Sequence, residues 1–183
     1  APGRAGAGCA AVLAGGVCCT WPDARDAGLR EERDAAALAA GWAEPMARRG
    51  MTQRYLASPG PHGPAAARNF GWRAARGRII AFTDDDTLPD PGWLVAGAQA
   101  FEQGAEAAWG RIVMPIPPEP TDYERDANGL ERATFVTANC FCLRSVLERL
   151  GGFDERFRLA WREDSDLYFR LIGAGARIVH VPR

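Results

Sequence analysis

Hydrophobic and polar positions follow two alternating periods from residue 51 onward. Short apolar runs predict buried strands, whereas longer segments with apolar residues three and four positions apart predict helices. The predicted strands are TQRYLAS, RIIAFT, AAWGRIVM, ATFVTANCFCL and ARIVHV. The predicted helices are GPAAARNFGWRAARG, the segment begun by Asp90 as cap and Pro91 as first residue, RSVLERLGG and EDSDLYFRLIGAG.

Strands that alternate with helices predict an α/β domain with a mostly parallel sheet flanked by helices. The residues at the helix ends agree with this prediction, because Pro64 lies near the start of the first predicted helix and Gly77 lies just past its end. Within 115–129, the sequence PIPPEPTDYERDANG is too rich in proline and charge for a regular element. We therefore expect a loop there.

Residues 1–50 carry weaker signals. The run CAAVLAGGVCC is compatible with a strand or with a small-residue helix, and the good helix formers that follow have mostly alanine at their apolar positions. Burying alanine gains less than burying leucine or phenylalanine, so we expect this region to add little to a core. The chain is divided into a divergent or non-native region, 1–50, and a domain, 51–183, as a single domain overall.

Composition narrows the function classes. The chain has 183 residues and a net charge of −1, so it fits one domain and shows no basic balance for nucleic acid or an anionic membrane. All 22 basic residues are arginine, and the missing lysine excludes a P-loop and Schiff-base chemistry. Five cysteines without a Cys-x-x-Cys pattern indicate reduced thiols and a cytoplasmic location, with the inner face of the membrane as an alternative.

The apolar runs and the first residue of the sequence bear on membranes and on completeness. No run approaches the length of a transmembrane segment. The absence of an initiator methionine and of a recognisable signal peptide is consistent with a fragment.

The run IIAFT leads directly into Asp84, Asp85 and Asp86. In open α/β sheets ligands bind beyond the carboxyl ends of strands. Carboxylates that repel each other at such an end are relieved by Mg²⁺ or Mn²⁺, which bind carboxylate, phosphate and water oxygens. A solvated acidic turn is the alternative, because aspartate is common in turns.

A second acidic cluster, Glu163, Asp164 and Asp166, opens a predicted helix. Acidic residues in a first turn are favoured by the helix dipole, so simple capping is one interpretation. Capping does not explain why the aromatic residues Phe157 and Trp161 precede this cluster. A carboxylate in this position can also face a cleft and take a proton from a bound hydroxyl.

A third feature, Arg68 with Asn69, lies on the helix before the aspartate strand. Arginine is a natural partner of a diphosphate, although a surface arginine on an ordinary helix is the commoner case. Together the three features resemble the family 2 glycosyltransferases with a GT-A fold, over roughly Met51 to Pro182. The resemblance is carried by GPAAARNFGWRAARGRIIAFTDDDTLPDPGWL, FVTANCFCLRSVLERLGGFDERF and EDSDLYFRL.

The resemblance implies inverting transfer of a sugar from a nucleotide-diphosphate donor to a hydroxyl of a glycan, a lipid-linked or a small-molecule acceptor. Nucleic acid is not an expected partner. Asp84 and Asp86 would be the two acids of the Asp-x-Asp motif, with Mg²⁺ or Mn²⁺ held by Asp86. Asp84 would lie nearer the ribose or donor sugar, and Asp85 would occupy the variable middle position of the donor site.

The remaining site residues are also implied by the resemblance. Asp164 would be the catalytic base, with Glu163 beside it on the acceptor side. Arg68 would lie near the diphosphate, and Asn139 would face the donor sugar or the acceptor pocket. The segment PIPPEPTDYERDANG would be an acceptor-facing loop.

Three alternatives stay open. The base- and ribose-binding turns of the family are not found in residues 1–50, which favours a degenerate GT-A domain acting as a binding module or an out-of-frame N-terminal region. A haloacid-dehalogenase-like phosphatase also begins with a strand and Asp-x-Asp, but Leu88 stands where it needs Thr or Val. A sugar nucleotidyltransferase needs a glycine-rich basic loop, which GRAGAG matches poorly.

Overall fold

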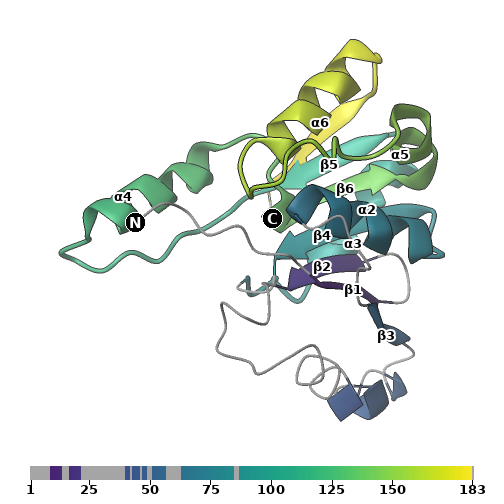
Figure 1. The fold of residues 1–183 in the computed structure, drawn as a ribbon, viewed down its shortest axis with the longest axis horizontal. Helices are drawn as coiled ribbons and strands as arrows, with labels where there is room; N and C mark the ends of the chain where they lie inside the picture. The colour runs from purple at the N-terminus through teal and green to yellow at the C-terminus, as the bar shows by residue number, and fades with distance from the viewer. Residues whose placement is uncertain are drawn as a thin grey trace.

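The computed structural model of the chain describes residues 9–13, 17–21, 40–41, 43–45, 47–48, 51–56, 63–84 and 87–182. Within these ranges, seven strands form one sheet with the order β3-β1-β2-β4-β6-β5-β7 (Figure 1). The strands are β1 (Cys9–Leu13), β2 (Val17–Trp21), β3 (Gln53–Leu56), β4 (Ile79–Asp84), β5 (Ala107–Gly110), β6 (Cys140–Leu143) and β7 (Ile178–Val181).

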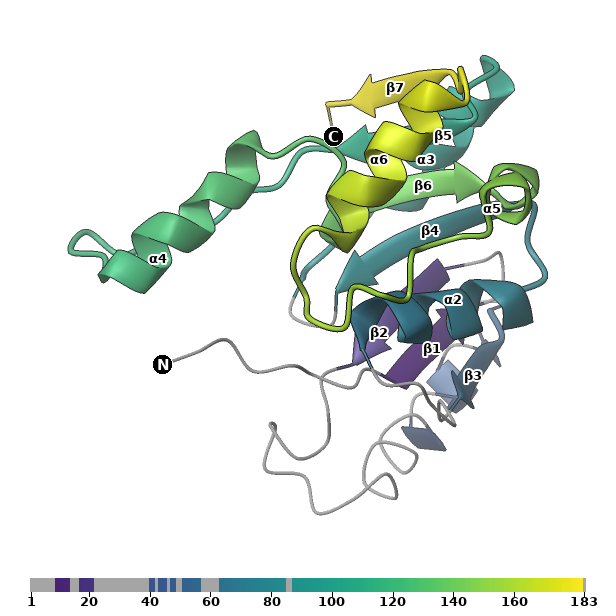
Figure 2. The same cartoon turned by 45° about the horizontal axis from the view of Figure 1, so that its top comes forward.

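Helices cover both faces of the sheet, namely α2 (Pro64–Ala74), α3 (Trp93–Glu102), α5 (Arg144–Leu150) and α6 (Glu163–Gly173). Outside the sheet lies α4 (Asp122–Ala127), and short 3-10 helices occur at Asn128–Arg132 and Thr137–Asn139. Figure 2 shows α2, α5 and α6 on one face and α3 behind the other. None of the helices in the described ranges is long and apolar enough to cross a membrane.

The period of two in a strand places alternate residues of β4 and β6 in separate cores. Phe82 and Cys140 pack with Leu147 and Leu167 beneath α2, α5 and α6. Phe141 packs instead against α3 on the other face. The reading of Cys140 and Cys142 as small buried hydrophobes is confirmed, and burial raises the pKa of both thiols well above its usual range.

The α/β architecture and each predicted strand and helix after residue 51 are confirmed, with shorter bounds for four of the five strands. The predicted strand ATFVTANCFCL is reduced to Cys140–Leu143, because Phe135 adopts a left-handed φ of 59° and a 3-10 turn follows. Helix α3 begins two residues later than expected. Gly92 is the cap, and Asp90 Oδ1 accepts from the Gly92 N–H at 2.8 Å in the preceding turn.

The expectation of a mostly parallel sheet is wrong, because the described pairings are mixed. The β2–β4 and β5–β7 pairs are parallel, and the β1–β2, β1–β3, β4–β6 and β5–β6 pairs are antiparallel. Residues 14–16 alone separate β1 from β2, and so short a link permits a hairpin but no crossover to a parallel partner.

The loop expected for PIPPEPTDYERDANG is also wrong, because it contains α4. The prolines precede the helix, and Thr121 begins it with a capping box. Thr121 Oγ1 accepts from the Glu124 N–H at 3.3 Å, and the Glu124 carboxylate accepts from the Thr121 N–H at 2.7 Å. Residues 111–134, named the arm here, project from the sheet in Figures 1 and 2, and α4 buries none of its residues.

The run CAAVLAGGVCC forms β1 and β2, which resolves the choice between strand and helix. Each is paired on both sides, so part of region 1–50 belongs to the same sheet as the later strands. How much its side chains add to the core lies outside the described residues. That expectation and the boundary after residue 50 remain predictions.

Candidate functional site

The candidate site lies where β4 ends and α6 begins. Thr87 contacts the end of β4, because its hydroxyl donates to the Asp84 carbonyl at 2.7 Å and lies 2.6 Å from the Thr83 hydroxyl. Asp84 itself is the last residue of β4. Asp85 and Asp86 lie outside the described residues, so their expected binding roles remain predictions.

Arg68 joins the end of β4 to the first turn of α6. Its Nη1 donates to Glu163 Oε1 at 2.6 Å, and its Nη2 donates to Asp84 Oδ1 at 3.0 Å. The Arg68 side chain is only 5% exposed, and its guanidinium lies 5.9 Å from the centre of the Phe153 ring. The two acidic motifs of the sequence therefore share one buried cation.

The charges in this bridge are set by burial and pairing together. Burial alone would lower the pKa of Arg68, but Asp84 and Glu163 together raise it above its usual value, so the guanidinium stays charged. For Glu163, burial raises the pKa, and attraction to Arg68 offsets that effect only in part. The ionised form of Glu163 thus depends on Arg68 remaining beside it.

Asp164 lies next to this bridge but outside it. The side chain is partly exposed, and Oδ1 accepts from the Ser165 N–H at 2.6 Å. No residue in the described ranges donates a hydrogen bond to its Oδ2. Asp166, by contrast, accepts from Arg170 Nε through Oδ2 at 2.8 Å. Both side chains are partly exposed, but Asp166 is held by an arginine, whereas the hydrogen bonds that Asp164 accepts come from Ser165 beside it.

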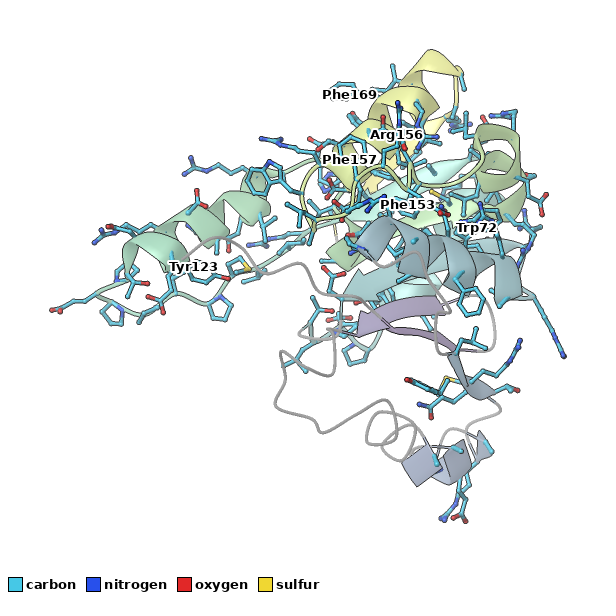
Figure 3. All side chains as sticks on the ribbon, viewed as in Figure 1. Trp72, Tyr123, Phe153, Arg156, Phe157 and Phe169 are labelled. Carbon is cyan, nitrogen blue, oxygen red and sulfur yellow. The ribbon has the colours of Figure 1, made fainter. Side chains whose placement is uncertain are left out.

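Asn69, adjacent to Arg68 on α2, anchors the segment between α5 and α6. Its Oδ1 accepts from Trp72 Nε1 and the Phe153 N–H, both at 2.9 Å, and its Nδ2 donates to the Phe153 carbonyl and to Glu155, both at 2.8 Å. Figure 3 shows Trp72 and Phe153 on the same side of the molecule. The sequence does not predict this role of Asn69; the signal for it is a polar pair inside a helix of small apolar residues.

Asn139 is engaged elsewhere. Its Oδ1 accepts from Trp93 Nε1 at 2.8 Å, and its Nδ2 donates to the Arg111 carbonyl at 2.8 Å. The side chain also packs so closely against Gly110 that an added Cβ would lie 2.5 Å from Nδ2. The amide thus joins α3 to the start of the arm, and its expected contact with donor or acceptor remains a prediction.

The described carboxylates near Asp84 bear on whether the site fits a divalent cation. Within the described ranges, His, Cys, Asp and Glu side chains form no group of three or more that could hold a metal ion. Asp84 offers a carboxylate at a strand end, although its Oδ1 already accepts from Arg68. A single protein carboxylate of this kind fits Mg²⁺ or Mn²⁺, because these ions often bind through one or two carboxylates together with substrate phosphates and water.

Comparison with known proteins identifies the family of the chain. Residues 36–160 match the model of glycosyl transferase family 2, a range that starts before residue 51 and ends just before the first turn of α6. Two curated relatives are named pre-mycofactocin glycosyltransferase, from the CDC 1551 / Oshkosh and ATCC 25618 / H37Rv strains of Mycobacterium tuberculosis. Each is 36% identical over 143 residues, which cover 69% of this chain and 30% of the relative. This chain therefore matches less than a third of the length of those relatives.

Proposed function

Because this chain belongs to glycosyl transferase family 2 and has the GT-A fold of that family, we propose that it transfers a sugar from a nucleotide-diphosphate donor to an acceptor hydroxyl with inversion. The observation that carries the proposal is the bridge from Asp84 through Arg68 to Glu163. This bridge places Asp84, which is expected to bind the donor, close to the first turn of α6, which is expected to contain the catalytic base. A solvated acidic turn and a helix cap would not need a shared buried cation.

In this proposal Asp164 is the catalytic base. Its Oδ2 takes the proton of the acceptor hydroxyl as the oxygen attacks the sugar carbon on the face opposite the leaving diphosphate. The Ser165 N–H donates to Oδ1 and so orients the carboxylate. A single displacement of this kind inverts the configuration at the sugar carbon and needs no covalent sugar–enzyme intermediate.

On the donor side we assign Asp84 and Asp86 to Mg²⁺ or Mn²⁺, with Asp84 also nearer the ribose or sugar. When bound, such a cation neutralises the charge that develops on the departing diphosphate. Asp86→Asn is expected to weaken Mn²⁺ binding with little loss of fold, because it removes one of several repelling carboxylates. Calorimetric titration giving equal Mn²⁺ affinity for both proteins would refute the ligand role.

The acceptor class is proposed from the arm and from the relatives. The arm carries exposed side chains such as Val113 and Tyr123, and we assign it to the acceptor side of the site. Because the relatives are named for pre-mycofactocin, a small-molecule acceptor of that kind is the first to test, ahead of glycan or lipid-linked acceptors. The location proposed is the cytoplasm, including the inner face of the membrane.

The experiment is a transfer assay with a panel of nucleotide sugars, Mn²⁺ and that acceptor, comparing Asp164→Asn with Asp166→Asn. Asp164→Asn should lower turnover by roughly 10²- to 10⁴-fold, the usual effect of removing a positioned base, with donor affinity unchanged. Asp166→Asn should mainly lower the melting temperature, because it breaks the Arg170 pair. A greater loss of turnover in Asp166→Asn, at equal melting temperature, would reverse the assignment. Donor binding without turnover in the unaltered chain would favour the binding module.

A further inference from the structure

Arg68 is the described residue that contacts both acidic motifs, and its position is unsuited to a ligand-binding arginine. Both Nη atoms are committed to protein carboxylates, and only 5% of the side chain is exposed. We propose that Arg68 is a positioning residue, which sets the places of Asp84 and Glu163 and through them the catalytic arrangement, and that it does not bind the diphosphate. The catalytic part of this inference rests on the proposed function.

The alanines that precede Arg68 on α2 allow its side chain to lie between β4 and α6. Ala65, Ala66 and Ala67 are all buried, so α2 approaches the sheet closely and its next residue enters the space between β4 and α6. A planar guanidinium can donate to two carboxylates in different directions, whereas a lysine ammonium is a compact point charge on a flexible stem. The geometry at Arg68 therefore requires arginine.

The bridge determines which way Asp164 points. Arg68 holds the Glu163 carboxylate inward, where it is almost fully buried. Consecutive helix residues lie about 100° apart around the axis, so fixing Glu163 inward turns Asp164 to the side of the helix. Asp164 is indeed partly exposed there. Glu163 thus acts through its neighbour and is not placed to contact an acceptor.

The bridge also sets the charge at Asp84. Two carboxylates share one guanidinium, so removing the charge of Glu163 leaves Asp84 facing the whole positive charge. Removing Arg68 as well takes away the positive charge that competes with a metal cation for Asp84. These two changes should act in opposite directions on the affinity of Asp84 for a cation, which a purely structural role would not produce.

The first measurement is thermal unfolding of Arg68→Met, Glu163→Gln and the double variant. Arg68→Met should lower the melting temperature strongly or prevent folding, because it leaves the buried Glu163 carboxylate uncompensated. Adding Glu163→Gln should restore part of the loss, because it removes that charge. The control is Arg149→Met, which breaks a surface pair with Glu106 and should change little. A double variant no more stable than Arg68→Met would overturn the bridge.

The second measurement is Mn²⁺ affinity by electron paramagnetic resonance titration. Glu163→Gln should weaken Mn²⁺ binding by roughly 3- to 10-fold, and the double variant should recover it, as expected for charges a few ångströms apart near a protein surface. Asp166→Asn, which removes a carboxylate of the same helix turn that is paired with Arg170, should have a smaller effect. Equal affinities in Glu163→Gln and the double variant would overturn the charge coupling.

The two measurements separate this inference from the proposed function. If the unaltered protein binds no Mn²⁺, the metal assistance in the proposed function fails, and the unfolding comparison alone decides the bridge. If Mn²⁺ binds and the variants shift its affinity as expected while no sugar is transferred, the bridge stands and the transferase activity fails.

Discussion

Carboxylates within a few residues of one another near α6 have different physical roles because their partners differ. Glu163 is buried against Arg68, Asp164 is partly exposed and accepts from Ser165, and Asp166 pairs with Arg170 on its own helix. Asp154, before the helix, is held by the Arg156 guanidinium and by the Arg156 N–H. Residue type alone therefore does not separate a base from a structural acid.

Asp154 provides a test at this scale. Hydrogen bonds from Arg156 lower its pKa from the ordinary value of 3.8 to about 2. A depressed folded pKa means that this stabilisation is present above the unfolded pKa and is lost as the pH falls toward 2. Asp154→Asn should therefore lower the urea midpoint at pH 6, and the difference from the unaltered protein should shrink on acidification. A difference that is constant from pH 6 to pH 2 would contradict this expectation.

At the scale of elements, α2 organises the site through consecutive residues. Arg68 reaches β4 and α6, while Asn69 holds the segment that leads from α5 to α6. That segment begins with Gly151 and Gly152, whose φ values of 78° and 77° favour glycine. A Cβ on Gly152 would lie 2.3 Å from Asn69 Oδ1, whereas a Cβ on Gly151 would meet nothing within 4 Å.

These adjacent glycines form a matched pair of variants. Gly151→Ala should cost about 1–2 kcal/mol in the free energy of unfolding, the penalty for a left-handed residue with a Cβ. Gly152→Ala should cost a further ~1–3 kcal/mol, because the added methyl overpacks the Asn69 and Trp72 side chains. Urea unfolding of both variants checks the order. Equal destabilisation would show that the Asn69 contact is not tightly packed.

At the scale of the whole molecule, the sheet separates two cores, and the arm stands apart from both. The clusters on the two faces of β4 and β6 contain the large buried side chains, including Phe82 and Phe141. The strands β1 and β2 join the same sheet on its β3 side through the CAAVL and VCCTW sequences. Small residues dominate those sequences, so they offer less apolar area than β4.

This difference in apolar area predicts that backbone amides are protected from hydrogen exchange to different extents across the sheet. Amides of β1 and β2 should exchange with solvent faster than those of β4 and β6, although all four strands are paired on both sides. Local opening there exposes less apolar surface and therefore costs less free energy. Hydrogen exchange followed by mass spectrometry compares the four strands within one sample. Protection of β1 and β2 equal to that of β4 would show that residues 1–50 contribute fully to the core.

Apolar period, capping and turn residues act over a few neighbouring positions, so the order of amino acids was enough to predict the elements after residue 51, with the exception of α4. It also marked Asp84 and the acidic start of α6 as chemically unusual. The packing of distant elements decided that Arg68 joins residues 16 and 95 positions away, that Asn139 accepts from Trp93, and that most described strand pairs are antiparallel. Such contacts depend on how distant elements pack against each other. Local sequence patterns therefore do not predict which distant side chain contacts a buried charge.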